Sequence, residues 1–302
     1  MKNLIERINK LKKEKNAIIL AHSYQNIEID TVADYVGDSL YLSQKAKETK
    51  ADIIVFAGVY FMAQTAKIIS PDKKVLLPNL QAGCLMADMI NLQQTIDFKK
   101  KHPKIPVVCY INSTAEVKSE CDICCTSSNA VEIVKSLNAP KVLFVPDANL
   151  GKYVESQLNG VEVITYAGCC PVHDNVTVQN IVDIRKKYPN AKVLIHPECK
   201  PEISKLGDYI GSTSGIIDYV KNSNDSQFVI VTEKGVADRL KRDYPNKEFI
   251  LISEEMLCES MKLTTLDEIL YSLEHEVNEI TLDEKTIELS AGCIERMLKV
   301  SK

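Results

Sequence analysis

Three cysteines stand at nearly equal intervals along the chain, and each follows a short apolar run. Cys84 and Cys170 are 86 residues apart, and Cys170 and Cys258 are 88 residues apart. Cys169 adjoins Cys170, and spacing alone does not distinguish these two because small insertions shift the count. Three thiolates without a fourth in register do not complete a closed tetrahedral zinc site. They suit a [4Fe–4S] cluster that leaves one iron open to a substrate.

Polar side chains recur at the same intervals of 88 and 86 residues. The recurring sets are His22, Tyr110 and His196; Tyr24, Asn112 and Glu198; and Ser39, Ser127 and Thr213, with Ser212 adjacent to the last. We expect these side chains to line one cavity and to bind an anionic substrate. Glu198 is the only carboxylate among the strand-end positions, which makes it the candidate general acid or base. Helix starts rich in Ser and Thr bind anions, although they can also serve only as N-caps.

The segments between these residues alternate between strand and helix patterns. Nine short runs rich in β-branched residues predict strands over 17–21, 53–57, 75–77, 107–111, 142–145, 161–165, 193–195, 228–231 and 249–252. Helix-period segments such as 127–137 and 178–188 lie between them. Continuously apolar strands that alternate with helices predict parallel α/β sheets covered on both faces.

The strands come in three sets of three, which indicates an internal repeat. We expect three quasi-equivalent three-layer αβα repeats with parallel sheets around a pseudo-threefold axis, over residues 1–86, 87–172 and 173–258. Open parallel sheets bind ligands at the carboxyl ends of their strands, so the cysteines and polar residues should face one central crevice. Residues 259–302 contain two further helix patterns, 265–275 and 283–300, and we expect this tail to close the first repeat.

The composition argues against several classes of protein. The 302 residues include 37 basic and 41 acidic side chains, and this balance gives no basis for binding nucleic acid. No apolar run approaches the ~20 residues that cross a membrane, and the N-terminal segment has the pattern of an amphipathic helix. We therefore expect a cytoplasmic protein, in which structural disulfides are rare. With only 11 glycines, the chain has no glycine-rich phosphate loop.

Several short motifs, in a fixed order, resemble the quinolinate synthase (NadA) family over roughly residues 4–300. The motifs are His22-Ser23-Tyr24-Gln25, Gly37-Asp38-Ser39, Gly83-Cys84, Tyr110-Ile111-Asn112-Ser113, residues 125–130, residues 146–151, Cys170-Pro171-Val172-His173, His196-Pro197-Glu198-Cys199 and residues 211–215. The family's fold has three α/β domains around a central cluster, which agrees with the repeat.

The resemblance implies a reaction and the residues that perform it. Iminoaspartate (iminosuccinate) would condense with dihydroxyacetone phosphate to give quinolinate, with loss of phosphate and water, in NAD biosynthesis. An aspartate oxidase or dehydrogenase would supply the iminoaspartate. One [4Fe–4S] cluster, with an open iron as Lewis acid, would be held by Cys84, Cys170 and Cys258. Substrate contacts would fall on His22, Ser39, Tyr110, Ile111, Asn112, Ser127, His196, Pro197, Glu198, Ser212 and Thr213. Catalysis would fall on Glu198, Tyr24, Tyr110 and His196.

Some residues depart from the family pattern or lie outside it. Family members usually show Cys-Pro-Asn-Met at the third ligand, whereas this chain has Cys258-Glu259-Ser260-Met261. Cys121 and Cys124 form a CxxC that is either a redox-regulatory pair or, as we favour, two buried thiols. His102 and His173 fall in loop-like segments, and we expect both to face solvent.

Two other functions are compatible with three cysteines in a triplicated fold. One is a radical enzyme that cleaves S-adenosylmethionine on a similar fold, as in diphthamide synthesis. The other is a non-enzymatic iron–sulfur sensor, which would show no turnover. The cavity lining of His, Tyr, Asn and Ser suits a small anion and therefore favours the condensation reaction.

Overall fold

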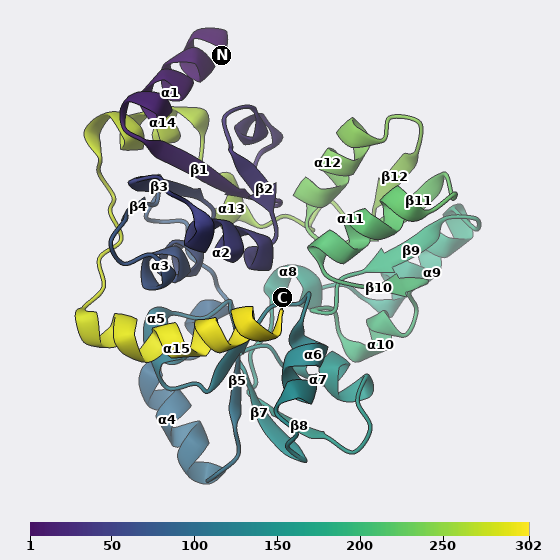
Figure 1. The fold of residues 1–302 in the computed structure, drawn as a ribbon. Helices are drawn as coiled ribbons and strands as arrows, with labels where there is room; N and C mark the ends of the chain where they lie inside the picture. Colours follow the sequence, from purple (N-terminus) through teal and green to yellow (C-terminus); the bar gives the residue numbers. More distant parts are fainter. Residues whose placement is uncertain (302) are drawn as a thin grey trace.

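The computed structural model describes residues 1–301, which form three units around a common centre (Figure 1). Each unit contains one parallel four-stranded sheet. The first sheet comprises β1 (Ala17–His22), β2 (Tyr35–Gly37), β3 (Ile53–Ala57) and β4 (Lys74–Leu76). The second comprises β5 (Val107–Tyr110), β6 (Ile123–Cys125), β7 (Lys141–Val145) and β8 (Glu162–Thr165). The third comprises β9 (Lys192–Ile195), β10 (Tyr209–Ile210), β11 (Gln227–Val231) and β12 (Glu248–Leu251).

The three sheets share one strand order. It is β2-β1-β3-β4 in the first unit, β6-β5-β7-β8 in the second and β10-β9-β11-β12 in the third. The strands β1, β5 and β9 therefore lie inside their sheets, at the point where the strand order changes direction. Ligands of open α/β sheets bind beside this point. The predicted α/β class with three repeated units is confirmed.

Three short edge strands are not predicted by the sequence pattern. They are β2, β6 and β10, and each has only two or three residues, too few to show a period. An aspartate just before each one ties it to the neighbouring inner strand. The carboxylates of Asp34, Asp122 and Asp208 accept hydrogen bonds from the backbone amides of Ile19, Val107 and Val193 at 2.7, 2.7 and 2.8 Å. The repeat therefore extends to individual hydrogen bonds.

Helices connect the strands and cover the sheets. They are α1 (Lys2–Glu14), η1 (Ile27–Thr31), α2 (Ser39–Glu48), α3 (Tyr60–Ile69), η2 (Ala87–Met89), α4 (Leu92–Lys101), α5 (Ala115–Ser119), α6 (Ala130–Ser136), α7 (Ala148–Ser156), α8 (Pro171–Asp174), α9 (Val178–Lys187), α10 (Pro201–Ser204), α11 (Thr213–Asn222), α12 (Lys234–Asp243), α13 (Glu259–Lys262), α14 (Leu266–His275) and α15 (Glu284–Val300). None of these helices combines the length and apolar character needed to cross a membrane.

Both faces of the first sheet are covered, which makes the unit three layers thick. Ile8 of α1 and Ile269 of α14 pack with Ile19 on one face. Leu42 of α2 packs on the other face with Leu20, the next residue of β1. Adjacent strand residues point to opposite faces, so an apolar residue at every position is what a doubly covered strand requires.

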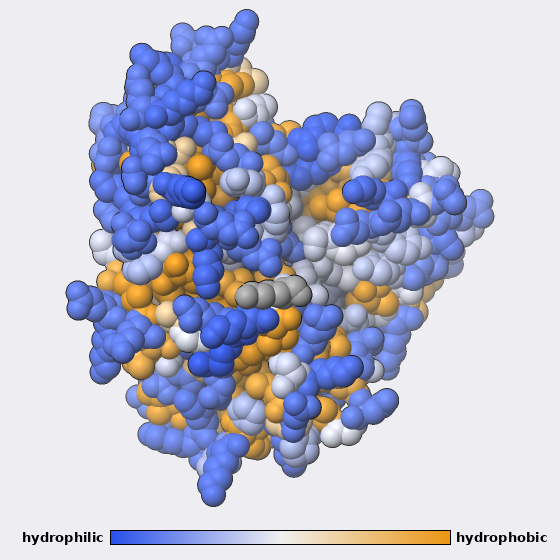
Figure 2. Space-filling view, viewed as in Figure 1, coloured by the Kyte–Doolittle hydropathy of each residue, from blue (hydrophilic) through white to orange (hydrophobic). Residues whose placement is uncertain are grey.

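The tail beyond residue 258 is divided between two units. The helix α14 packs on α1 of the first unit, as expected, whereas α15 packs mainly on α5 and β6 of the second unit and also on α3. The expectation that the whole tail closes the first repeat is therefore wrong for α15. Cys293 and Ile294 of α15 are fully buried in the same core as Ile123 of β6. The helix runs as a yellow band across Figure 1, and apolar residues gather alongside it in Figure 2.

Candidate functional site

One cavity lies where the three units meet, at the carboxyl ends of β1, β5 and β9. It holds about 670 Å³ of space free of protein atoms, part of which is open to solvent. Twelve of the fifteen predicted site residues line it: His22, Tyr24, Ser39, Cys84, Tyr110, Asn112, Ser127, Cys170, His196, Glu198, Thr213 and Cys258. The repeat thus brings equivalent side chains from three units to one place.

Three predicted substrate contacts do not line this cavity. Ile111 is 1% exposed and belongs to the apolar core. Pro197 is buried in the turn after β9. Ser212 caps α11, and its hydroxyl accepts a hydrogen bond from the amide of Gly215 at 3.1 Å. Each of the three directly adjoins a residue that does line the cavity. Consecutive side chains point in different directions, so only one of two neighbours faces the cavity.

The Ser and Thr residues expected at helix starts occupy those places in two cases of three. Ser39 and Thr213 are the first residues of α2 and α11, which are ten residues long. Ser127 lies in a turn, because α6 begins at Ala130 and not at residue 127. The first-turn amides of a helix have no intrahelical partners, so α2 and α11 offer donors for an anion beside the cavity.

Each of the three cysteines stands just before a helical turn. Cys170 directly precedes α8, Cys258 directly precedes α13, and Cys84 lies three residues before η2. Burial raises the pKa of all three thiols, that of Cys84 to about 12. The backbone amides three residues ahead, those of Ala87, His173 and Met261, oppose this rise. A bound cation is what would keep three such buried groups as thiolates, the form that ligates metals.

The turn after Cys258 forms without the proline that follows Cys170. In α8 the amide of His173 donates to the carbonyl of Cys170 at 3.1 Å, and in α13 the amide of Met261 donates to the carbonyl of Cys258 at 3.0 Å. The backbone at the third cysteine therefore matches that at the second. The departure from the family motif changes the residue types without changing the turn.

Two buried carboxylates beside the cysteines are absent from the sequence prediction. Glu233 is fully buried and accepts hydrogen bonds from the amide of Cys258 at 3.3 Å and from Nζ of Lys262 at 3.0 Å. Asp147, 86 residues earlier, is equally buried, caps α7, and lies beside the amide of Cys170. Burial raises the pKa of both carboxyls. Tyr110 and His196 are separated by the same 86 residues, so the interval of the strand-end polar residues could have identified this pair.

A continuous hydrogen-bond chain runs from Glu198 to Tyr24. Nδ1 of His173 lies 2.8 Å from Oε2 of Glu198, and Nε2 of His173 lies 3.0 Å from Oγ1 of Thr232. Oγ1 of Thr232 is 3.1 Å from the hydroxyl of Tyr24, which also accepts a hydrogen bond from Thr213 at 3.1 Å. The expectation that His173 faces solvent is wrong, because its side chain is 1% exposed. Thr232, which follows β11, is also missing from the sequence prediction.

Glu198 is the charged centre of the cavity. The hydroxyl of Tyr110 donates to its Oε1 at 2.5 Å, while His173 and His196 stand beside its Oε2. Burial favours the protonated acid, but the two imidazoles and the hydrogen bonds outweigh burial and hold the pKa of Glu198 below its usual range. Glu198 is therefore a carboxylate at neutral pH. Burial and the charge of Glu198 raise the pKa of Tyr24 and of Tyr110, so both hydroxyls keep their protons.

Several other groups of the polar wall are neutral, although the carboxyl side chains of Asp38 and Glu233 also line the cavity. Burial lowers the pKa of His22 to about 4 and that of His196 to about 3, so both imidazoles are uncharged at neutral pH. The side-chain oxygen of Asn112 is buried and has no hydrogen-bond partner among the described residues. A buried acceptor left unpaired is costly. A ligand with an N–H or O–H group directed at Asn112 would satisfy it.

Cys170, His173 and Glu198 form a compact group, with their ligand atoms within 4.8 Å of one another. Nδ1 of His173 is shared between Sγ of Cys170 at 3.3 Å and Oε2 of Glu198 at 2.8 Å. Because Nδ1 is already engaged by the carboxylate, we interpret this group as a hydrogen-bonded link between the cysteine and the proton chain.

The CxxC pair lies away from this cavity. Cys121 and Cys124 are both buried, and Sγ of Cys121 donates to the carbonyl of Val117 at 3.1 Å. Sγ of Cys124 is 3.1 Å from Sγ of Cys293 on α15. Cys124 therefore contacts a thiol of the tail, and the interpretation of Cys121 and Cys124 as buried thiols fits this arrangement.

Comparison with known proteins agrees with the motifs. The chain matches the family model described as "Quinolinate synthetase A protein" over residues 6–299. Relatives named quinolinate synthase include the protein of Alkaliphilus metalliredigens, which is 51% identical over 298 residues, 99% of this chain and 98% of the relative. That of Clostridioides difficile is 46% identical over 301 residues, 100% and 99% of the two chains. That of Pelobacter propionicus is 47% identical over 297 residues, 98% of each. With full-length matches of this kind, and a cavity lined by its motif residues, the chain belongs to the quinolinate synthase family.

Proposed function

We propose that this enzyme synthesises quinolinate from iminoaspartate and dihydroxyacetone phosphate, with release of phosphate and water. The observation that carries the proposal is the meeting of cysteine, histidine, tyrosine and glutamate side chains from three units in a single cavity. Full-length similarity to proteins named quinolinate synthase supports the same activity.

We infer that Cys84, Cys170 and Cys258 hold one [4Fe–4S] cluster with one iron open. The donor set fits, because three soft thiols from different units share a cavity and each has a backbone amide beside its sulfur. Among the described residues, the three sulfurs do not form a group within 4.8 Å of one another, and this wider spacing suits a cluster better than a single ion. When bound, the cluster supplies a Lewis-acidic iron that polarises a substrate oxygen.

The hydrogen-bond chain gives Tyr24 the role of proton carrier. Glu198 accepts a hydrogen bond from Nδ1 of His173, which leaves Nε2 of that imidazole as the atom that accepts a proton. A substrate proton taken up at the Tyr24 oxygen is matched by transfer of the tyrosine proton through Thr232 to Nε2 of His173. Glu198 then balances the charge of the imidazolium. Tyr110 stays protonated and donates to Glu198, which holds the carboxylate in place.

Neutral and hydroxyl groups bind the substrates. The oxygen of Asn112 accepts a hydrogen bond from an N–H or O–H group of the substrate. The starts of α2 and α11, with Ser39 and Thr213, bind carboxylate or phosphate oxygens. His22 and His196, uncharged at neutral pH, donate hydrogen bonds without pairing permanently with the anion. Burial of these groups keeps bulk water away from an imine that water would hydrolyse.

The chemistry of the imine also constrains its source. An imine of oxaloacetate is hydrolysed in water, so it must be formed close to where it is used. We propose that an aspartate oxidase or dehydrogenase supplies it, and that both proteins work in the cytoplasm.

Quinolinate formation by anaerobically purified protein tests the proposal. Iminoaspartate is generated in place from oxaloacetate and ammonia, dihydroxyacetone phosphate is added, and quinolinate and phosphate are measured together with iron and sulfide. We expect brown protein that releases quinolinate and phosphate in equal amounts. Iron-loaded protein that forms no quinolinate contradicts the proposal. Cleavage of S-adenosylmethionine by the same preparation would support the radical enzyme, and inactivity in both assays would support the sensor.

A further inference from the structure

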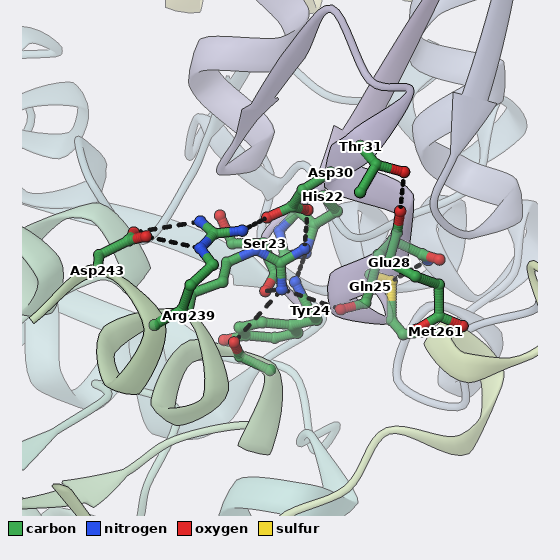
Figure 3. Close-up of polar contacts among 12 residues, drawn as sticks. His22, Ser23, Tyr24, Gln25, Glu28, Asp30, Thr31, Arg239, Asp243 and Met261 are labelled. Carbon is green, nitrogen blue, oxygen red and sulfur yellow. Dashed lines mark hydrogen bonds and ion pairs between the residues drawn. The ribbon is translucent and has the colours of Figure 1, made fainter. Parts of the chain in front are cut away.

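Figure 3 shows a contact between the third and first units at the loop that contains Tyr24. Arg239 lies on α12 of the third unit, and its side chain is 5% exposed. Its Nη1 donates to the carbonyl oxygens of Ser23 at 2.6 Å and Gln25 at 2.9 Å, and its Nη2 donates to the carboxylate of Asp30 at 2.5 Å. The guanidinium thus reaches out of its own unit and into the loop that follows β1.

Three consecutive carbonyl oxygens of this loop are held by cations from distant parts of the chain. Arg239 binds the first and the third, and Nζ of Lys262 donates to the second, the carbonyl of Tyr24. Hydrogen bonds from charged donors are stronger than neutral ones. Because Tyr24 lies between the two carbonyls bound by Arg239, its backbone cannot shift without breaking these contacts.

The charge of Arg239 is balanced across the same interface. Asp30, from η1 of the first unit, lies 2.5 Å from Arg239 and 2.7 Å from Arg242, both on α12. The side chain of Asp30 is 11% exposed. Breaking a buried pair by removing one partner is costly, because the other charge stays buried. The pair therefore opposes separation of η1 from α12.

The two surfaces approach closely at position 235 of α12. A Cβ atom added to Gly235 would lie 2.8 Å from Oε2 of Glu233, 3.0 Å from the carbonyl oxygen of Ser23 and 3.0 Å from Cα of Tyr24. The two contacts with the loop are tighter than most real Cβ contacts, so a larger residue would require the loop to shift by a few tenths of an ångström. Glycine at this position permits the close backbone approach that Arg239 then secures.

We propose that Arg239 is a positioning residue for Tyr24, and that it acts by docking α12 onto the loop of residues 23–25. Tyr24 belongs to the first unit, whereas its hydroxyl partners Thr232 and Thr213, each at 3.1 Å, belong to the third. Thr232 lies in the short connection between β11 and α12, so the docking of α12 also places Thr232. The inference rests on the proposed function, in which Tyr24 carries a proton. The guanidinium reaches the two carbonyls through Nη1 and the carboxylate through Nη2, and the single nitrogen of a lysine does not reproduce this planar arrangement.

Hydrogen–deuterium exchange on the anaerobic, iron-loaded full chain tests the docking without reference to turnover. Arg239→Gln should raise exchange at the amides of residues 23–25 about tenfold, because the loop opens locally, and should leave iron content unchanged. Arg185→Gln is the matched control, since Arg185 binds Leu206 and Asp208 within the third unit, and it should leave this exchange unchanged. Unchanged exchange in Arg239→Gln overturns the proposal.

A kinetic cycle separates positioning from general destabilisation. Arg239→Gln should lower kcat about tenfold with little change in KM, and Arg239→Lys should fall between it and the parent protein. In a Tyr24→Phe background the same replacement should lower kcat little further, since the hydroxyl that Arg239 positions is already absent. Equal losses in both backgrounds would leave Arg239 only a structural role and overturn the proposal.

The proposal can also be tested if Arg239→Gln fails to fold or if the parent protein is inactive. If Arg239→Gln does not fold, both measurements are made on Asp30→Asn. This variant weakens the same docking and keeps the guanidinium, and we expect changes in the same directions. If the parent protein forms no quinolinate but exchange at residues 23–25 responds to Arg239, the docking stands and the proposed function fails.

Discussion

Nδ1 of His173 lies 2.8 Å from Oε2 of Glu198, and both side chains are almost fully buried. His173 follows Cys170 by three residues, in the turn that begins at this cysteine. A single turn therefore contains both Cys170, a proposed cluster ligand, and His173, the imidazole of the proton chain. Glu198 fixes the tautomer of that imidazole and leaves Nε2 to accept a proton from Thr232.

Replacing His173 with Gln should break the proton chain and leave the cysteines in place. We expect kcat to fall by about 10²- to 10⁴-fold, the usual contribution of a positioned acid or base. Iron content should match that of the parent protein. Steady-state quinolinate formation, with iron analysis of the same preparation, measures both. His102→Gln, at the end of α4 and outside the cavity, is the control and should keep full activity. Turnover at the parent rate in the His173 variant would remove this residue from the mechanism.

Each of the replacements Cys84→Ala, Cys170→Ala and Cys258→Ala should abolish binding of the cluster, because two remaining thiolates do not hold it. Cys169→Ala is a demanding control, since Cys169 adjoins Cys170 but does not line the cavity. Iron and sulfide analysis after anaerobic reconstitution measures the outcome. Loss of iron in Cys169→Ala together with its retention in Cys170→Ala would show that the second ligand is misassigned.

The repeat made much of the fold and site predictable from the sequence. Equivalent positions at intervals of 88 and 86 residues must meet if the units surround one axis, and residues such as His22, Asn112 and Glu198 do line one cavity. The apolar runs predicted nine strands, namely the inner strands and the edge strands β4, β8 and β12. The repeat could not show that Ile111 and Ser212 lie outside the cavity. The interval applies equally to neighbouring residues, and only the backbone conformation decides which side chain faces inward.

The residues that sequence reasoning missed stand where the repeats differ. The positions equivalent to His173 hold Ala87 and Met261, so no shared chemistry marks them. The position equivalent to Asp147 and Glu233 holds Val59 in the first unit. His173 thus occurs in one unit and the Asp147–Glu233 pair in two. A search for residues that recur in all three units therefore overlooks them.

Glu233→Ala should weaken the hydrogen bonding that holds the backbone at Cys258. The backbone amide of Cys258 would lose its acceptor, and the ammonium of Lys262 would keep only the carbonyl of Tyr24. An unsatisfied buried group costs about 1–3 kcal/mol. We expect faster loss of iron to a chelator and a lower free energy of unfolding, with a smaller effect for Glu233→Gln, which keeps one acceptor. Glu254→Gln, an exposed carboxylate in the neighbouring loop, is the control. Equal iron retention in Glu233→Ala and the control would show that Glu233 does not hold this turn.

The neutral histidines predict how stability depends on pH. The pKa is about 4 for His22 and about 3 for His196, against an ordinary value of 6.5. Between these values the unfolded chain binds more protons than the folded chain, so the free energy of unfolding rises with pH and is lost on acidification below 6.5. The loss is roughly 2 kcal/mol per histidine at pH 5. The lowered pKa of the Glu198 carboxyl acts only below its ordinary value of 4.5, whereas the raised pKa values of Asp147 and Glu233 oppose the histidines. A comparison of urea unfolding curves from pH 7 to 5 between the parent protein and single variants therefore isolates each histidine. His22→Gln should reduce the loss of unfolding free energy between pH 7 and pH 5 by roughly 2 kcal/mol, and His275→Gln, at an exposed position, should leave this pH dependence intact. The same pH dependence in His22→Gln as in the parent protein would mean that His22 is not buried in its neutral form.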